Sequence, residues 1–301
     1  MRKVKVAVTQ MKSRGQSAEN IAAADRLVRQ AAAAGARIIL LQELMETDFF
    51  CQRMLERNIP WGAALEDNPA VAHFRRVAAE LEAVIPVSYF ERAGQARYNS
   101  LAVIDADGRI LGTYRKSHLP DGPGYSEKFF MNIGDTGFRV WNTRYGKIGC
   151  GVCWDQWFPE AARCLALQGA EMLLYPTAIG SEPEDPGADT MLPWRTVMQG
   201  HAAANMMPVL ASNRIGVEYC EDCQVTFYGS SFIADAQGQI VEQLDRESEG
   251  FAWAEFDLDA LDHNRRAWGF FRDRRPDLYG PIMTLDGVTP APKLTAKEVL
   301  P

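Results

Sequence analysis

The order in which strand patterns and helix patterns follow one another constrains the fold of this chain more than any other feature. Residues 4–9 form a short β-branched run. An amphipathic stretch comes next, and after it residues 36–43 form an apolar run, "ARIILLQE". Asn68 and Pro69 are residue types that cap and start a helix, and the next strand pattern covers residues 84–90. Strands that alternate with helices in this way predict β-α-β crossovers and an α/β fold.

Two hairpins interrupt this alternation. "LAVIDADGRILGTYRK" and "SFIADAQGQIVEQLD" each place apolar alternation around an Asp-rich, Gly-containing turn, at residues 105–108 and 235–238. Helical patterns after Pro159 and near Pro193 are each followed by another apolar strand pattern. The mixture of crossovers and hairpins predicts large mixed sheets with helices packed outside them.

No linker interrupts residues 1–280, which we expect to form a single domain. The remaining residues, 281–301, are rich in Pro, Thr and Lys, and we expect them to form an extended C-terminal tail.

The composition excludes several classes of function. With 47% hydrophobic and 24% charged residues and a net charge of −7, the chain has an ordinary globular composition and disfavours nucleic acid or an anionic membrane as a partner. The N-terminal "MRKVKVAVTQ" lacks the apolar core of a signal peptide, and no run of about 18 apolar residues occurs. We therefore expect a cytoplasmic protein whose six cysteines are reduced thiols.

Three ionisable residues lie where predicted strands end. Glu43 ends "IILLQE", Lys116 ends "ILGTYRK", and Cys153 ends "KIGCGVC". The carboxyl ends of strands are where ligands bind in sheets with crossover helices. Taken alone, a cysteine there is most often a small buried hydrophobic residue and a lysine is solvated. A glutamate beside a core needs a partner or water, because an unpaired buried charge costs several kcal/mol.

A cysteine nucleophile needs a proton acceptor and a nearby positive charge. Each of the four histidines, His73, His118, His201 and His263, has an ordinary structural explanation, although the sequence does not exclude a Cys-His-Asn arrangement. Glu43 and Lys116 offer an alternative in which a carboxylate is the base.

The cysteine spacing also allows a different class of protein. Cys150 and Cys153 form one C-x-x-C pair and Cys220 and Cys223 another, so four thiolates could hold a structural zinc ion in a binding protein. We expect the first pair to lie on an extended strand with its side chains on opposite faces of the sheet, which disfavours zinc.

Three motifs carry a resemblance that covers nearly the whole chain. "LLQELMETDFF", "YRKSHLPDG" and "GCGVCWDQWFPEAAR" follow one another in the order found in the nitrilase superfamily of carbon-nitrogen hydrolases, which this sequence resembles. The resemblance implies a four-layer αββα sandwich, with Cys153 as nucleophile, Glu43 as general base and Lys116 as electrophilic stabiliser. Glu127, in "SEKFF", matches the second glutamate of the family, which orients the lysine and the substrate nitrogen. The segments "MNIGDTGF" and "EYCEDC" depart from the pattern.

Segments outside these motifs, among them "YPTAIGSEP" and "FRDRRPDLYGP", resemble the branch that hydrolyses the ureido group of a cationic amine. An oxyanion formed by attack of Cys153 needs donors, which Lys116 and the backbone N–H of Trp154 can provide. No metal or organic cofactor is needed. The acidic loop "GSEPEDPGAD" contains no cation, and we expect its Glu182 to bind the substrate amine.

Two alternatives within the superfamily remain: an amidase of ureido acids such as N-carbamoyl-β-alanine, and a nitrilase. The resemblance also implies a homo-oligomer, a dimer or larger, in which C-terminal segments contribute to the interface.

Overall fold

The computed structural model describes residues 1–289, and the larger of its two compact units, Met1–Asn264, contains both main sheets. The first sheet has the order β14-β1-β2, and a bridge between Ile38 and Val84 continues it into β3-β4-β5. Its strands are β1 (Lys3–Gln10), β2 (Ile38–Leu40), β3 (Ile85–Ala93), β4 (Ala96–Ile104), β5 (Ile110–Arg115) and β14 (Gly250–Asp257). β1 and β2 are parallel, as the predicted crossover requires.

The second sheet has the order β13-β12-β9-β8-β7-β6. Its strands are β6 (Val140–Thr143), β7 (Gly146–Cys150), β8 (Met172–Pro176), β9 (Val209–Ser212), β12 (Phe232–Ala234) and β13 (Ile240–Gln243). β7, β8 and β9 run parallel and are joined by two helical crossovers, whereas the remaining pairs are antiparallel. Both sheets are therefore mixed, as predicted.

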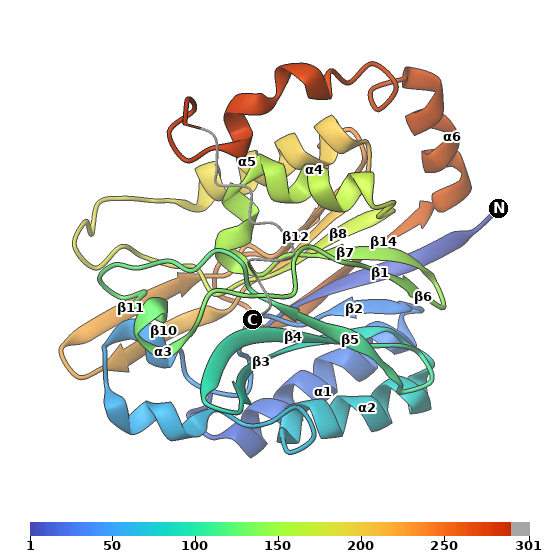
Figure 1. The fold of residues 1–301 in the computed structure, drawn as a ribbon. Helices are drawn as coiled ribbons and strands as arrows, with labels where there is room; N and C mark the ends of the chain where they lie inside the picture. The colour runs from blue at the N-terminus through green and yellow to red at the C-terminus, as the bar shows by residue number, and fades with distance from the viewer. Residues whose placement is uncertain (290–301) are drawn as a thin grey trace. The chain divides into compact units, whose positions relative to one another are not determined.

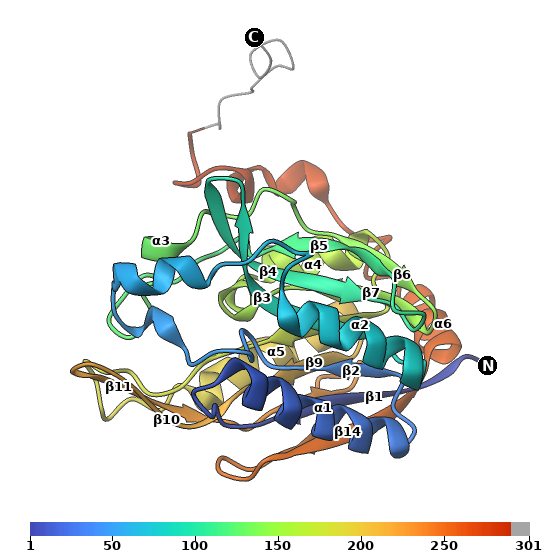
Figure 2. The same cartoon turned by 90° about the horizontal axis from the view of Figure 1, so that it is seen from below.

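Helices cover the outer face of each sheet (Figures 1 and 2). α1 (Ser17–Ala33) and α2 (Pro69–Leu81) pack on the first sheet, and α4 (Pro159–Leu167) and α5 (Met191–Asn205) pack on the second. Alternate residues of a strand point to opposite faces, so Ile39 packs under α1 and α2 while Ile38 and Leu40 face the other sheet. The predicted four-layer αββα sandwich is confirmed.

Both predicted hairpins form, β4–β5 and β12–β13, and each turns tightly against a helix. Gly108 and Gly238 have φ of +80° and +82°, and their backbone N–H groups donate to Asp105 O and Asp235 O. A Cβ atom on Gly108 would lie 2.5 Å from the Arg75 carbonyl oxygen in α2. Glycine is thus required there both by the backbone conformation and by the close approach.

The start of α2 also follows the prediction. Asn68 Oδ1 accepts a hydrogen bond from the Val71 N–H at 2.9 Å, and Pro69 is the first helical residue. This cap satisfies a backbone donor that the helix itself cannot satisfy.

Shorter elements complete the described chain. They are the 3₁₀ helices η1 (Phe50–Gln52), η2 (Glu56–Trp61) and η3 (Cys153–Trp157), the helix α3 (Glu127–Phe130), and the hairpin β10 (Ile215–Cys220)–β11 (Cys223–Tyr228). The segment "EYCEDC", which departs from the family pattern, forms the tip of that hairpin. Cys220 and Cys223 lie opposite each other there as residues of the two strands.

The boundary between the two units falls within α6 (Leu258–Trp268), because the smaller unit begins at Arg265. Within it lie η4 (Pro276–Leu278) and η5 (Gly280–Met283). The expected tail, residues 281–301, lies partly outside the described residues, and the single domain over 1–280 stays a prediction.

Candidate active site

The three predicted residues all follow strands of the two central layers. Glu43 lies three residues after β2, Lys116 directly after β5, and Cys153 three residues after β7. Glu127, the fourth predicted residue, begins α3.

Lys116 lies at the centre of this site. Its Nζ donates to Glu43 Oε1 at 2.8 Å and to the two carboxylate oxygens of Glu127 at 2.7 and 2.8 Å. Asn99, in β4, donates from Nδ2 to the same Glu43 oxygen at 2.6 Å. Lys116 is 1% exposed and both glutamates 0%, so one buried ammonium faces two buried carboxylates. Such a group is stable only when every charge has its partner.

Glu43 retains one oxygen for chemistry. Lys116 and Asn99 both bind Oε1, whereas the buried Oε2 has no hydrogen-bond partner among residues 1–289. A buried carboxylate oxygen without a donor is costly in a resting protein, and such groups are found where a substrate or proton completes the site.

Burial and the neighbouring charges together set the protonation state of the Cys153 thiol. Burial raises the pKa of the Cys153 thiol well above its usual range, the Glu43 carboxylate raises it further, and Lys116 opposes the shift. Burial works against the charge on Lys116, but Glu127 and Glu43 outweigh it and raise the pKa of the ammonium. Burial also raises the pKa of Glu127, which Lys116 opposes. The resting site therefore holds a neutral thiol beside a charged lysine.

Cys153 lies on a strained turn. It is the first residue of η3 and has φ of +43°, a region that residues with a Cβ rarely occupy. Asp155 fixes the turn, since its Oδ2 accepts from the Val152 N–H at 2.9 Å and from the Tyr114 hydroxyl at 2.7 Å. The thiol lies 3.8 Å from the Ala178 carbonyl oxygen, just beyond the end of β8.

Known proteins resemble this chain over nearly its whole length. Residues 5–266 match the carbon-nitrogen hydrolase family. The chain belongs to this family. It is 55% identical over 290 residues to an N-carbamoylputrescine amidase from Arabidopsis thaliana, covering 95% of this chain and 97% of that protein. A citrullinase from Francisella tularensis is 50% identical, covering 94% and 99%. A crystal structure of a carbon-nitrogen hydrolase from Helicobacter pylori G27 is 38% identical, with a TM-score of 0.89 and coverage of 94% and 99%.

Membership of the carbon-nitrogen hydrolases makes this protein an enzyme. His118 Nδ1 is 2.7 Å from Asp155 Oδ1, and His201 Nε2 is 2.8 Å from the Gln156 carbonyl oxygen. Both histidines hold the η3 turn, which favours Glu43 over a histidine as the partner of Cys153.

Sequence reasoning missed three residues of this carbon-nitrogen hydrolase site: Asn99, Asp155 and Arg214. Arg214 is fully buried, and its Nη2 donates to the carbonyl oxygens of Glu43 at 2.9 Å and Leu44 at 2.8 Å. Its Nη1 binds Glu218 Oε1 at 2.7 Å. The signal for Asn99 was visible, because it interrupts the apolar pattern "YNSLAVI", but nothing local marks Arg214.

Trp154 and Glu182 are the two predicted substrate-binding residues. Trp154 directly follows Cys153 and is partly exposed. Glu182 is partly buried and lines a cavity of about 540 Å³. Burial raises the pKa of Tyr125 and of Tyr228, and the negative charges of Glu182 and of a Cys153 thiolate raise it further. The lining of the cavity contains none of the four predicted catalytic residues.

The four cysteines of the zinc alternative do not form one cluster. Among residues 1–289 no group of three or more metal-binding side chains occurs. The reason expected from the sequence, that Cys150 and Cys153 face opposite sides of one strand, was wrong. β7 ends at Cys150, so the alternation of a strand does not extend to Cys153, and both side chains pack in the core between the sheets. Along the described chain, no helix is long and apolar enough to cross a membrane.

Proposed function

We propose that this enzyme hydrolyses N-carbamoylputrescine to putrescine, carbon dioxide and ammonia through a covalent intermediate on Cys153. The observation that carries the proposal is the buried Glu43–Lys116–Glu127 group that acts on the Cys153 thiol. The 55% identity to the amidase of that name supports the choice of substrate.

The first step is attack of Cys153 on the ureido carbon. Because the pKa of the thiol is raised, Glu43 Oε2 takes the proton as the S–C bond forms. The oxyanion is stabilised by the Lys116 ammonium and the Trp154 backbone N–H, and one such donor is worth about 3 kcal/mol of the barrier. Glu127 keeps Lys116 charged and in place.

The second step breaks the C–N bond and then releases the product. Glu43 returns the proton to departing ammonia, leaving the N-(4-aminobutyl)carbamoyl group on the Cys153 sulfur as an S-thiocarbamate. Glu43 next deprotonates a water that attacks the same carbon, and the proton returns to the cysteine sulfur. The released N-carboxyputrescine decomposes to putrescine and carbon dioxide.

We infer that the cavity lined by Glu182 holds the far end of the substrate, and its lining favours an amine without a carboxylate. Its lining contains the acidic residues Glu182, Glu184 and Asp222 and one cation, Arg53, whose guanidinium already binds Asp222 at 2.8 Å. A protonated amine finds carboxylates there, with Glu182 the most buried of the three. The α-carboxylate of citrulline would have to displace Asp222 from Arg53, so citrulline is the second candidate.

A substrate panel on the purified enzyme tests the proposal. N-carbamoylputrescine should give the highest kcat/KM among that compound, citrulline, N-carbamoyl-β-alanine, a simple amide and a nitrile. A higher kcat/KM for citrulline would assign the second candidate, and a higher value for N-carbamoyl-β-alanine would exclude an acidic amine site.

Glu182 has its own test. A charge-assisted contact is worth about 1.5–3 kcal/mol, so Glu182→Gln should lower kcat/KM for N-carbamoylputrescine about 10- to 150-fold and spare N-butylurea. Asp185→Asn, an exposed change in the same loop but outside the lining of the cavity, is the matched control. Equal losses on both compounds would indicate disruption of the loop instead.

Further properties belong to the same proposal. We infer a cytoplasmic homo-oligomer, a dimer or larger, that binds neither nucleic acid nor membranes. The net charge of −7 supports the last two points, and exposed apolar residues of the smaller unit, among them Leu278, Ile282 and Met283, support an interface. Sedimentation of the full chain measures the assembly.

A further inference from the structure

The hairpin β10–β11 ends in a pair of cysteines that the proposed mechanism does not use. The hairpin extends from one end of the sandwich (Figures 1 and 2). Cys220 is the last residue of β10 and Cys223 the first of β11, so a turn of two residues separates them and they lie directly opposite each other. Both are free thiols. Two nucleophilic side chains therefore share the tip of the hairpin, apart from the four catalytic residues proposed above.

Burial along the two strands shows that both side chains leave the same face of the hairpin. In β11, Cys223, Val225 and Phe227 are buried, whereas the residues between them are exposed. Glu218, which lies opposite Val225, is buried too, so Cys220, two residues later in β10, shares this face. Residues directly opposite each other have Cα atoms about 4.5–5.5 Å apart, and a disulfide spans about 4.4–6.8 Å between Cα atoms. Rotation of the two side chains is therefore enough to join the sulfurs.

The turn between the cysteines is held by two ion pairs. Arg53 Nε lies 2.8 Å from Asp222 Oδ1, and Arg57 Nη1 lies 2.9 Å from Glu221 Oε1. These contacts anchor the turn to the segment that contains η1 and η2. The folded protein thus keeps the two thiols opposite each other, whereas an unfolded chain has to bring them together at a cost in conformational entropy.

The two thiols differ in their access to solvent. Cys220 is partly exposed, whereas Cys223 is 3% exposed and lines the cavity that contains Glu182. Burial raises the pKa of both thiols, and the guanidinium of Arg53 opposes the shift in each. Cys220 is therefore the thiol that meets an oxidant first, and Cys223 is placed to react with it from the wall of the cavity.

We propose that Cys220 and Cys223 form a reversible disulfide when the enzyme meets a small disulfide such as oxidised glutathione. The Cys220 thiolate attacks one sulfur of that disulfide, breaks its S–S bond and releases one thiol, which takes the proton that Cys220 lost. The Cys223 thiolate then attacks the Cys220 sulfur and releases the second thiol. Two protein thiols are thereby oxidised, and one disulfide is reduced to two thiols. In reducing compartments such pairs act as transient redox sites.

Thiol trapping in glutathione buffers tests the site on the full chain. Trypsin releases residues 215–246 as one peptide, in which Cys220 and Cys223 are the only cysteines. As the proportion of oxidised glutathione rises, this peptide should lose two hydrogen atoms and carry neither glutathione nor the iodoacetamide that blocks free thiols. Dithiothreitol should restore both thiols. Two labelled thiols at every ratio, or glutathione retained on both cysteines, would overturn the proposal.

The chain contains its own matched control, because Cys150 and Cys153 have the same spacing. Cys150 is 0% exposed, and that pair lies in a different tryptic peptide, residues 148–163. In the folded enzyme it should form no disulfide, whereas in urea both pairs should oxidise alike. Cys220 and Cys223 should form their disulfide at least about tenfold more favourably in the folded enzyme than in urea. Equal oxidation of the two pairs in the folded enzyme would overturn the assignment to the hairpin.

Single variants separate the two steps of the exchange. Cys223→Ser should retain glutathione on Cys220, because no second thiol remains to release it. Cys220→Ser should take up little glutathione, because the remaining Cys223 is buried. A folded Cys223→Ser protein that takes up no glutathione on Cys220 would contradict the first step.

Discussion

The proposed mechanism rests on one lysine held between two glutamates, and none of these three charges is exposed to water. Lys116, Glu43 and Glu127 are each almost fully buried, so each charge depends on the others for its stability. This arrangement keeps Lys116 an ammonium for the oxyanion and keeps one Glu43 oxygen available as a base. It also means that changes to these residues affect folding as well as turnover.

Lys116→Ala should abolish turnover and also destabilise the protein. Removing the ammonium leaves two buried carboxylates facing each other, which costs about 3–5 kcal/mol. Adding Glu127→Gln to Lys116→Ala should recover part of that stability but none of the activity. Urea denaturation of the two single variants and the double variant measures this coupling, and additive losses would show that the two side chains do not interact.

Glu43→Gln should lower kcat at least about 10²-fold with little loss of fold. The amide oxygen of glutamine can still accept from Lys116 and Asn99, but the –NH₂ group that replaces Oε2 cannot take the thiol proton. Steady-state kinetics with a thermal melt in parallel provide the measurement. A folded variant within a few-fold of the parent would remove Glu43 from the role of base.

At this scale the motifs predicted Glu43, Lys116, Glu127 and Cys153, because each lies in a recognisable local segment. Asn99 and Arg214 could not be predicted in the same way, since their roles arise from contacts across strands. Arg214 is 171 residues from Glu43 in the chain, yet it binds the backbone of that residue.

Among the elements, the β10–β11 hairpin and the residue before it position Glu43, the proposed catalytic base. Arg214, just before β10, holds the backbone at Glu43 and Leu44, and Glu218 within β10 holds Arg214. Glu218 also accepts from the Phe49 N–H at 2.5 Å. The segment that follows Glu43 is thereby fixed at two points.

Arg214→Lys should lower kcat more than it changes KM. A lysine keeps the charge but cannot bind two carbonyl oxygens and a carboxylate in one plane, so Glu43 shifts relative to the thiol. Small misplacements of a catalytic group cost up to about 10²-fold in rate. Kinetics with N-carbamoylputrescine separate the two parameters, and a change confined to KM would assign Arg214 to substrate binding.

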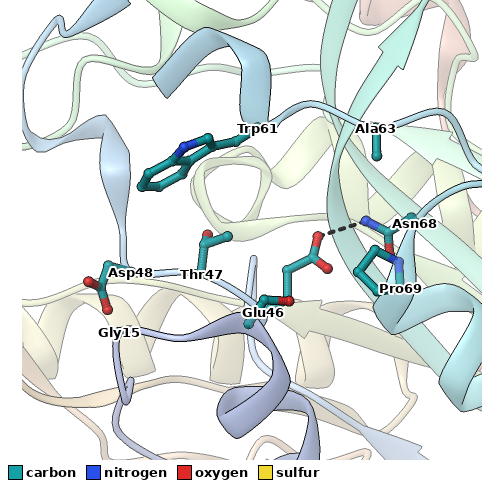
Figure 3. Close-up of a pocket in the computed structure, with 9 residues that line it drawn as sticks. Gly15, Glu46, Thr47, Asp48, Trp61, Ala63, Asn68 and Pro69 are labelled. Carbon is teal, nitrogen blue, oxygen red and sulfur yellow. Dashed lines mark hydrogen bonds between the residues drawn. The ribbon is translucent and has the colours of Figure 1, made fainter. Parts of the chain in front are cut away.

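Glu46, which accepts a hydrogen bond from the α2 cap residue Asn68 (Figure 3), makes stability depend on pH. Burial raises the pKa of Glu46 above the ordinary 4.5, so the folded protein holds this proton more tightly than the unfolded chain does. The contribution of this proton to the free energy of unfolding is therefore complete below pH 4.5, and it is lost as pH rises through the pKa of the folded state.

Glu46→Gln should consequently gain stability relative to the parent as pH rises from 4 to 8. Urea denaturation at a series of pH values measures the difference. The exposed change Glu66→Gln should give a difference without that slope, and a slope of the opposite sign in Glu46→Gln would contradict the account.

Elements with strong local signals were predictable: both hairpins from their Asp–Gly turns, and α2 from Asn68 and Pro69. The exact end of β7 was not. Its apolar pattern continues to Cys153, but the strand stops at Cys150 because Val152 and Asp155 form the turn that begins η3.

For the whole molecule, alternating strands and helices predicted mixed sheets covered by helices. The pairing of two sheets into four layers came from the family resemblance, because local patterns do not specify which strands meet across a core. The core between the sheets combines residues from β1 to β14, and it places the ends of β2, β5 and β7 around one site.

The central claim is that Cys153 carries the substrate carbon during turnover. Mass spectrometry of the enzyme, acid-quenched during turnover of N-carbamoylputrescine, tests it most directly. The account predicts an adduct with the mass of substrate minus ammonia on the peptide that contains Cys153, and no adduct or turnover in Cys153→Ala. Turnover without an adduct on that peptide, or substantial activity in Cys153→Ala, would contradict it.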